Sequence, residues 1–360
     1  MTGGRGPGPR CRDSGDAMGK AIRIVELHTA DTPVQPSDAQ LRWLNLGFGL
    51  SFHYGLNTFH DLEASDGSLD PASFDPVRFN AGHWASAARE AGAGYVLLVT
   101  KHLDGFCMWP TRQTDYSVLA SPGRRDILGE AVSAARAAGL KVALYYSFWE
   151  MRERSYHDDR AYASHVKRQL AELLTAYGEV VSLWCDGCWE RSGIDYYDPQ
   201  RTHWREIYEH VKSLQPDCLV GVNPTTHHPG KVVLWPCDFR IGEKCTPPEG
   251  DRNVYYCDRK ANFLPWEALF TLSEGGTKQG LFADGKWFWH ADDRTCHTAE
   301  WVLQHLRQCR RNGANLVINA GPDRDGRLRD RDLACLRAVG RAIAAAPTLL
   351  DLTLQVRRQA

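Results

Sequence analysis

The sequence lacks a dominant charge, a long apolar run and a glycosylation signal. Its 43 lysines and arginines nearly balance 44 aspartates and glutamates, so the one-sided charge that nucleic acid or an anionic membrane attracts is missing. No segment reaches the roughly 20 apolar residues that cross a bilayer, and residues 1–20 lack the apolar centre of a secretory signal. No Asn-x-Ser/Thr acceptor with a permitted middle residue occurs. We therefore expect a cytoplasmic protein that binds a small molecule, without nucleic-acid or membrane partners; the sequence predicts no particular oligomeric state.

The cysteines do not form the pattern of a disulfide framework. Eleven of them are scattered through the chain, and an odd number without an export signal is typical of reduced thiols. The segment SLWCDGCWE raises a sharper question, because it places Asp186 between Cys185 and Cys188. It could be a Cys-x-x-Cys redox or metal site, or it could be an acid that two cysteines flank.

The spacing around these two cysteines favours the acid. A redox pair should open a helix, whereas the residues after Cys188 resemble a loop. A zinc site needs two further ligands at short spacing, and Cys237 and Cys245 lie too far apart to provide them. We therefore interpret both flanking cysteines as packing residues and expect neither a metal nor a cofactor.

Short apolar runs alternate with amphipathic segments from about residue 45 onward. With 43% apolar residues and 12 tryptophans, the chain can bury a large core. The expected strands cover residues 47–55, 95–102, 141–148, 180–186, 218–223 and 315–321. The expected helices cover residues 83–91, 126–138, 160–177, 201–214, 296–312 and 328–345. This alternation without a linker favours a single TIM-like (β/α)8 barrel, although a doubly wound parallel sheet has the same periodicity.

The domain boundaries follow from this pattern. The barrel should extend over residues 45–345, between a lead-in segment at 21–44 and a C-terminal tail at 346–360. Residues 1–20 are rich in Gly, Arg and Pro, which predicts a disordered tail. The interval 225–290 has few clean periods, so it predicts long loops and leaves two strands of the barrel unplaced.

Polar and aromatic residues cluster where the predicted strands end. They are His53 and Tyr54, Lys101 and His102, Tyr145 and Tyr146, Asp186, Asn223 and Asn319. In a parallel barrel the carboxyl ends of the strands meet on one face, where such enzymes have their active sites. This convergence favours the barrel and a catalytic role for that face.

Asp186 is the leading catalytic candidate. It follows a buried run, and an ionised carboxylate is not left in a core without partners, so we expect it to point into the central cleft. A helix cap or a loop anchor is the alternative. Glu243 and Glu249 lie downstream in a loop on the same rim, although either could be an exposed loop acid. Two carboxylates about 5 Å apart make a retaining glycosidase, and a wider pair makes an inverting one.

Histidines and aromatic residues complete a candidate sugar site. His53 and His102 end neighbouring strands, where a structural role or a metal site is the alternative, although no carboxylate lies at ligand spacing. Aromatic faces beside neutral hydrogen-bonding groups suit a sugar, although each tryptophan could equally be a core residue. The aromatic candidates for substrate binding are Tyr146, Trp109, Trp184 and Trp289.

Several segments together carry a family resemblance. They are FGLSFHYGLNTF, KHLDGF, TDYSV, ALYYSFWE, LWCDG, DFRIGE, PWE and NLVINAGPDRDG. In order and spacing they resemble the α-L-fucosidases of glycoside hydrolase family 29, over residues 45–345. The resemblance implies a (β/α)8 catalytic barrel that hydrolyses terminal α-L-fucosides with retention, through a covalent glycosyl-enzyme intermediate. The implied substrate is a small molecule or an oligosaccharide with a terminal fucose.

The resemblance also implies individual roles. Asp186 matches the nucleophile, and His53 and His102 match histidines that bind fucose. Glu243 is the expected general acid/base, with Glu249 as the second choice.

Three features depart from the family pattern. Leu103 stands in KHLDGF where the family usually has a second histidine, and NPT at 223–225 lacks an expected arginine. The sequence stops at Ala360, so we expect no C-terminal β-sandwich. An alternative is therefore a catalytically impaired or specificity-shifted member that binds a sugar or a protein partner. The linkage and the aglycone are not predicted.

Overall fold

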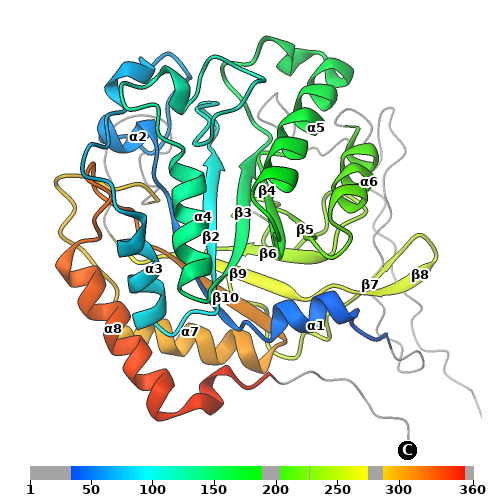
Figure 1. Cartoon of the computed structure of the whole chain (residues 1–360). Coiled ribbons are helices and arrows are strands. Elements are labelled where there is room, and N and C mark those ends of the chain that lie inside the picture. The colour runs from blue at the N-terminus through cyan, green and yellow to red at the C-terminus, as the bar shows by residue number, and fades with distance from the viewer. Residues whose placement is uncertain (1–33, 189–202, 227, 275–286, 353–360) are drawn as a thin grey trace, which may run out of the picture.

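Eight parallel strands close into a barrel in the computed structural model, which describes residues 34–188, 203–226, 228–274 and 287–352 (Figure 1). The barrel strands are β1 (Phe48–Phe52), β2 (Tyr95–Lys101), β3 (Lys141–Ser147), β4 (Ser182–Asp186), β5 (Leu219–Val222), β6 (Phe239–Glu243), β9 (Trp266–Thr271) and β10 (Ala314–Asn319). Strand β1 pairs with both β2 and β10, so no edge is left open. This closure distinguishes a barrel from a doubly wound sheet and confirms the predicted fold.

Helices cover the outside of the barrel, as Figure 1 shows. The α-helices are α1 (Asp38–Leu44), α2 (Leu56–Phe59), α3 (Ala81–Glu90), α4 (Ile127–Ala137), α5 (Asp159–Ala176), α6 (Trp204–Leu214), α7 (Ala299–Arg311) and α8 (Asp330–Ala345). Four short 3-10 helices are η1 (Pro71–Ser73), η2 (Val118–Ala120), η3 (Arg154–His157) and η4 (Pro347–Leu350). All six predicted helices are present. Side-chain caps such as Asp126 on α4 and Asp158 on α5 fix where they begin.

Alternation along each strand separates the barrel interior from the helix-facing core. In β3, Ala143 and Tyr145 belong to the interior cluster, whereas Leu144 and Tyr146 pack with the residues under the helices. Both sets are buried, which explains why the strands form continuous apolar runs in the sequence. The parity of each position decides which side chains can reach the mouth of the barrel.

The interval 225–290 supplies the two strands that the sequence did not place. They are β6 and β9. Between them in the sequence is an antiparallel hairpin of β7 (Val254–Cys257) and β8 (Lys260–Phe263), which projects from the barrel (Figure 1). Each of these strands contains a buried charged residue, Arg240 in β6 and Glu267 in β9, which interrupts the apolar run by which a strand is recognised in the sequence. Arg240 forms two hydrogen bonds to Asp251, at 2.9 and 2.7 Å.

Helix α1 closes the amino-terminal end of the barrel. The ring of Trp43 lies 4.8 Å from that of Phe239, between ring centroids, and its carbonyl accepts a 2.8 Å hydrogen bond from the Asn315 amide. The helix lies within the predicted lead-in segment. The predicted tail at 1–20 lies outside the described residues.

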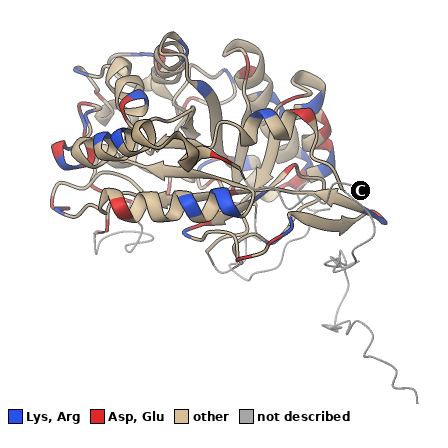
Figure 2. Ribbon diagram, turned by 90° about the horizontal axis from the view of Figure 1, so that it is seen from below, with Lys and Arg blue, Asp and Glu red and all other residues tan. Residues whose placement is uncertain are grey.

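The surface carries both signs of charge. Acidic and basic residues are interspersed over the helices and loops in Figure 2. Within the described part of the chain, no helix combines the length and the apolar character that crossing a bilayer requires.

Candidate active site

Polar side chains from seven strands meet at the carboxyl-terminal mouth of the barrel. Because side chains alternate along a strand, the last inward position of each strand faces this mouth. These polar residues are His53, His102, Asp186, Asn223, Glu243 and Asn319, which lie at or just after the strand ends, and Tyr145, which lies two residues before the end of β3.

A single amide nitrogen joins the two carboxyl groups of the site. Asn223 Nδ2 donates to Asp186 Oδ1 at 2.7 Å and to Glu243 Oε2 at 2.8 Å. These two oxygens therefore cannot be further apart than the sum of the two distances. Tyr145 donates its hydroxyl proton to the other oxygen of Asp186. Gly187, at φ +66°, turns the chain directly after Asp186, where a side chain would collide with Trp149.

The environments of the two carboxyl groups separate their roles. Burial raises the pKa of Asp186, while hydrogen bonds from Tyr145, Asn223 and the Gly187 N–H stabilise its charged form. Burial and the charge of Asp186 raise the pKa of Glu243 to about 7, and Asn223 opposes this shift. Asp186 thus has three donors to hold a negative charge, and Glu243 keeps a proton near neutral pH.

His53 is fixed in one neutral tautomer. Asn319 Oδ1 accepts from the His53 N–H at 3.0 Å and lies 2.7 Å from His53 Nδ1, while Asn319 Nδ2 donates to the Trp287 carbonyl at 2.7 Å. Because this oxygen can only accept, Nδ1 carries the proton and Nε2 is left as an acceptor. Burial lowers the pKa of His53 to about 4, although its hydrogen bond to Asn319 opposes this.

His102 lies beside His53 and is neutral as well. Their ring centroids are 5.8 Å apart, and the ring of Tyr145 stacks 6.0 Å from that of His102. Burial, with a smaller contribution from His53, lowers the pKa of His102 to about 3. Two uncharged imidazoles therefore lie near the acid pair, and each can donate one hydrogen bond and accept another.

Two aromatic residues pack against the histidines. The ring of Trp287 lies 5.2 Å from that of His53, and the ring of Phe288 lies 5.1 Å from that of His102. Lys244 places its ammonium 5.4 Å from the centre of the Trp287 ring. The mouth thus combines an acid pair, neutral hydrogen-bonding groups and aromatic faces, which is chemistry suited to a sugar.

Comparison with known proteins supports this interpretation of the geometry. The model of the α-L-fucosidase family matches residues 51–345. The chain belongs to the α-L-fucosidase family.

Curated members of the α-L-fucosidase family are longer than this chain. The putative α-L-fucosidase 1 of Oryza sativa subsp. japonica is 32% identical over 324 residues, which cover 84% of this chain and 57% of that protein. The α-L-fucosidase 1 of Arabidopsis thaliana is 28% identical over 332 residues, which cover 87% of this chain and 61% of that protein. The chain thus spans about three fifths of the length of these relatives.

Solved structures of the family share the fold. A glycoside hydrolase 29 family member from an unknown rumen bacterium has a TM-score of 0.74 at 27% identity, covering 87% of this chain and 57% of that one. The α-L-fucosidase isoenzyme 1 of Paenibacillus thiaminolyticus has a TM-score of 0.70 at 26% identity, covering 89% of this chain and 79% of that one.

Two of the predicted substrate-binding residues lie away from the mouth. Tyr146 points to the helix side of β3, where its hydroxyl donates to Gln169 at 2.6 Å and accepts from Lys101 at 3.1 Å. Trp109 donates to Glu172 of α5 at 2.9 Å. The inward neighbour Tyr145 takes the place that the sequence analysis gave to Tyr146, because alternation turns adjacent strand residues to opposite faces.

The other two predicted tryptophans border the site. Trp184 lies inside the barrel two residues before Asp186, stacks 5.3 Å from Tyr145 and is 2% exposed, so it supports the floor. Trp289 is half-buried with Arg324 5.9 Å from its ring. Trp287, rather than Trp289, packs against His53, and nothing in the repeated tryptophans of KWFWH distinguishes the two.

The structure brings Glu243, rather than Glu249, to Asp186. Glu243 ends β6, whereas Glu249 is exposed and lies in a surface pocket with Arg307 and Arg311 of α7. Leu103 is buried, at 6% exposure, and its carbonyl accepts a 2.9 Å hydrogen bond from the Met151 N–H.

Both cysteines that flank Asp186 are buried thiols. Burial raises the pKa of Cys185 and of Cys188, which disfavours the thiolate that redox or metal chemistry needs. Among the described residues, no group of three or more His, Cys, Asp or Glu side chains is placed to hold a metal ion.

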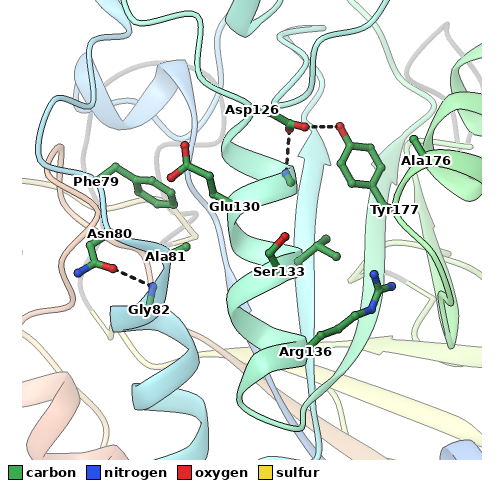
Figure 3. Close-up of a pocket in the computed structure, with 12 residues that line it drawn as sticks. Phe79, Asn80, Ala81, Gly82, Asp126, Glu130, Ser133, Arg136, Ala176 and Tyr177 are labelled. Atoms are coloured by element: carbon green, nitrogen blue, oxygen red, sulfur yellow. Dashed lines mark hydrogen bonds between the residues drawn. The ribbon is translucent and has the colours of Figure 1, made fainter.

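A second pocket lies on the outer surface between α3 and α4 (Figure 3). Polar side chains of this pocket already form hydrogen bonds that hold the helices in place. Asn80 accepts from the Gly82 N–H at 2.9 Å, and Asp126 accepts from the Gly129 N–H at 2.8 Å and from the Tyr177 hydroxyl at 2.9 Å. The mouth of the barrel is therefore the better candidate for catalysis.

Proposed function

We propose that the chain is a retaining glycoside hydrolase that removes terminal α-L-fucose through a covalent fucosyl intermediate on Asp186. One observation carries the mechanism, namely the shared hydrogen bonds of Asn223 to both carboxyl groups. They keep the nearest carboxyl oxygens within about 5.5 Å of each other, which suits a retaining enzyme and is below the roughly 6.5–9.5 Å between the carboxyl groups of inverting enzymes.

In the first step, a carboxylate oxygen of Asp186 attacks the anomeric carbon. The bond from that carbon to the leaving oxygen breaks, and Glu243 gives its proton to this oxygen. The raised pKa of Glu243, about 7, makes the proton available near neutral pH. Asn223 and Tyr145 hold Asp186 in the attacking position.

In the second step, Glu243 is a base. Its carboxylate takes a proton from water while the water oxygen attacks the anomeric carbon, and the bond to Asp186 breaks. Loss of the Asp186 charge in the intermediate lowers the pKa of Glu243, which suits this change of role. Fucose is released and both carboxyl groups return to their starting states.

The sugar specificity is inferred from two sources. The relatives named above are described as α-L-fucosidases. The neutral histidines His53 and His102, with Tyr145 and Trp287 close by, suit uncharged hydroxyl groups. We infer a small molecule or an oligosaccharide with a terminal fucose as the substrate.

Proton NMR of an aryl α-L-fucoside incubated with the chain tests this function. We expect release of the aryl group and α-L-fucose as the first product, before mutarotation. β-L-Fucose as the first product would contradict the mechanism, and absence of turnover would contradict the activity.

Leu103 supports a second candidate, a member that binds a sugar without efficient hydrolysis. An apolar side chain stands beside His102 where the family usually has another hydrogen-bonding group. Calorimetric binding of fucose without turnover of the fucoside would favour this candidate. Leu103→His should then strengthen fucose binding, and an unchanged affinity would count against it.

A further inference from the structure

A small cavity lies beside His102 of the site. Its lining includes Asn57, His102, Asp104, Met108 and Phe288. Its volume, the space open to the centre of a water molecule, is about 10 Å³. That is about the room that one buried water molecule requires.

Two residues that line this cavity carry unpartnered polar atoms. Asn57 is 1% exposed, and neither its amide oxygen nor its amide nitrogen has a hydrogen-bond partner among the described residues. The same holds for Nδ1 of His102. Buried polar groups are rarely left unpaired, because desolvation without a partner is costly. Unpartnered atoms on two residues of one cavity therefore indicate an ordered water molecule that links the Asn57 oxygen to His102 Nδ1.

A nearby carboxyl group sets the direction of the hydrogen bonds. Asp104 also lines the cavity, is 2% exposed and accepts a 3.2 Å hydrogen bond from the Phe106 N–H. Burial raises its pKa to about 7, so it is partly ionised near neutral pH. Above that pH Asp104 is ionised and can only accept, so a water that donates to it and to the Asn57 oxygen uses both its protons and can then only accept from His102 Nδ1.

We propose that one buried water molecule joins Asn57 to His102 Nδ1, and that Asn57 is thereby a positioning residue for sugar recognition. The link holds the proton of His102 on Nδ1 and leaves Nε2 as an acceptor. His102 then has the same tautomer that Asn319 imposes on His53 through a direct hydrogen bond. Two acceptors of the same kind suit two donating sugar hydroxyls.

The tautomer of His102 can be measured in the whole chain by ¹⁵N NMR of its imidazole nitrogens. A His102→Gln variant assigns the signals, and His53 provides an internal reference. Above pH 7, where Asp104 is ionised, we expect Nδ1 protonated and Nε2 unprotonated in the wild type. Protonated Nε2 in the wild type would overturn the proposal.

The variant Asn57→Leu tests the link itself, because it keeps the side-chain size but removes the polar atoms. We expect the His102 signals to shift toward the Nε2-protonated form, and KM for an aryl α-L-fucoside to rise roughly tenfold with a smaller change in kcat, the effect of losing one hydrogen bond. Met108→Leu, which alters the same cavity without a polar atom, is the matched control and should leave the signals unchanged. Unchanged signals in Asn57→Leu would overturn the proposal.

The catalytic part of this inference rests on the proposed fucosidase activity, whereas the tautomer does not. If the chain fails to hydrolyse the fucoside but His102 shows the expected tautomer and response, the proposed function fails and the water link stands. If hydrolysis proceeds with the opposite tautomer, the link fails alone.

Discussion

The two ends of the barrel interior each hold a glutamate with a pKa raised to about 7, and only one of them is placed for catalysis. Glu243 lies at the carboxyl-terminal mouth, where burial and the charge of Asp186 raise its pKa. Glu267 lies near the amino-terminal end, where burial alone raises its pKa and the Tyr95 hydroxyl, which donates at 2.5 Å, opposes the shift. A second carboxyl group faces the first glutamate, and a phenol faces the second.

The two glutamates differ in solvent exposure as clearly as in the groups that contact them. Glu267 is fully buried, above the closing helix α1. Around it, Arg310 donates to the carbonyls of Leu44 and Ala314 and to Asn315 Oδ1, at 2.9 to 3.1 Å. Asp186 and Glu243 are partly exposed. A raised pKa therefore identifies a buried acid, whereas a partner acid and an open path identify a catalytic one.

The largest expected effect comes from Asp186→Asn. The change removes the nucleophile and keeps its shape, so kcat/KM for an aryl α-L-fucoside should fall at least about 10³-fold, the scale seen when a nucleophile is lost. Glu267→Gln is the matched control, since it neutralises the buried acid at the other end. It should retain activity within about threefold. Comparable losses of kcat/KM in both variants would contradict the assignment of catalysis to the carboxyl-terminal mouth alone.

Glu243→Gln should have the next largest effect. Loss of a general acid typically lowers the rate about 10²–10⁴-fold. In the wild type, kcat/KM should fall as the pH rises above about 7, because Glu243 must be protonated to begin the reaction. It should also fall at low pH, where Asp186 loses its charge. The pH–rate profile of Glu243→Gln should lack the fall of kcat/KM at high pH. If this fall persists in the variant, a group other than Glu243 causes it.

Asn223→Leu should have a smaller effect, because it removes the bridge and leaves both acids in place. Loss of hydrogen bonds to charged groups predicts a fall of about 10- to 100-fold in kcat. Since Asn223 favours the charged form of Glu243, its removal should raise the pKa of Glu243 and shift the high-pH limb upward. A slower enzyme with an unmoved limb would indicate a merely structural role for this amide.

Glu267→Gln should change stability rather than activity. The folded-state pKa of Glu267 is about 7 against an ordinary value of 4.5. Its protonated form therefore favours folding below pH 4.5, and that contribution is lost as the pH rises to 7. The wild type should lose about 3 kcal/mol of unfolding free energy across this window relative to the variant. Urea unfolding of both proteins at both pH values measures this difference. An equal change of unfolding free energy in the wild type and the variant would show that burial does not perturb the pKa of Glu267.

Much of the fold could be predicted because six strands are continuous apolar runs. Strands β6 and β9 were missed because Arg240 and Glu267 interrupt their patterns, and only tertiary contacts satisfy these charges. Asp186, Glu243 and the two histidines were expected at one rim, and the structure brings them to the same mouth, whereas their catalytic roles stay predictions.

Side-chain parity was harder to predict. Tyr145 and Tyr146 are both fully buried, so periodicity cannot show which faces the interior. Which of Trp287 and Trp289 packs against the site depends on the path of a loop, and a loop has no periodic pattern in the sequence from which that path could be predicted. Asn223 was recognised at a strand end, but its bridging role depends on distances that no pattern contains.

Labelling with a 2-deoxy-2-fluoro-α-L-fucosyl donor that carries a good leaving group tests the central claim most directly. The fluorine slows both steps, and the leaving group keeps the first fast enough for the intermediate to accumulate. Mass spectrometry of the digested protein should find the added sugar on the peptide that contains Asp186. A label on Glu243 or on any other residue, or turnover of the fucoside without any labelled peptide, would contradict the account.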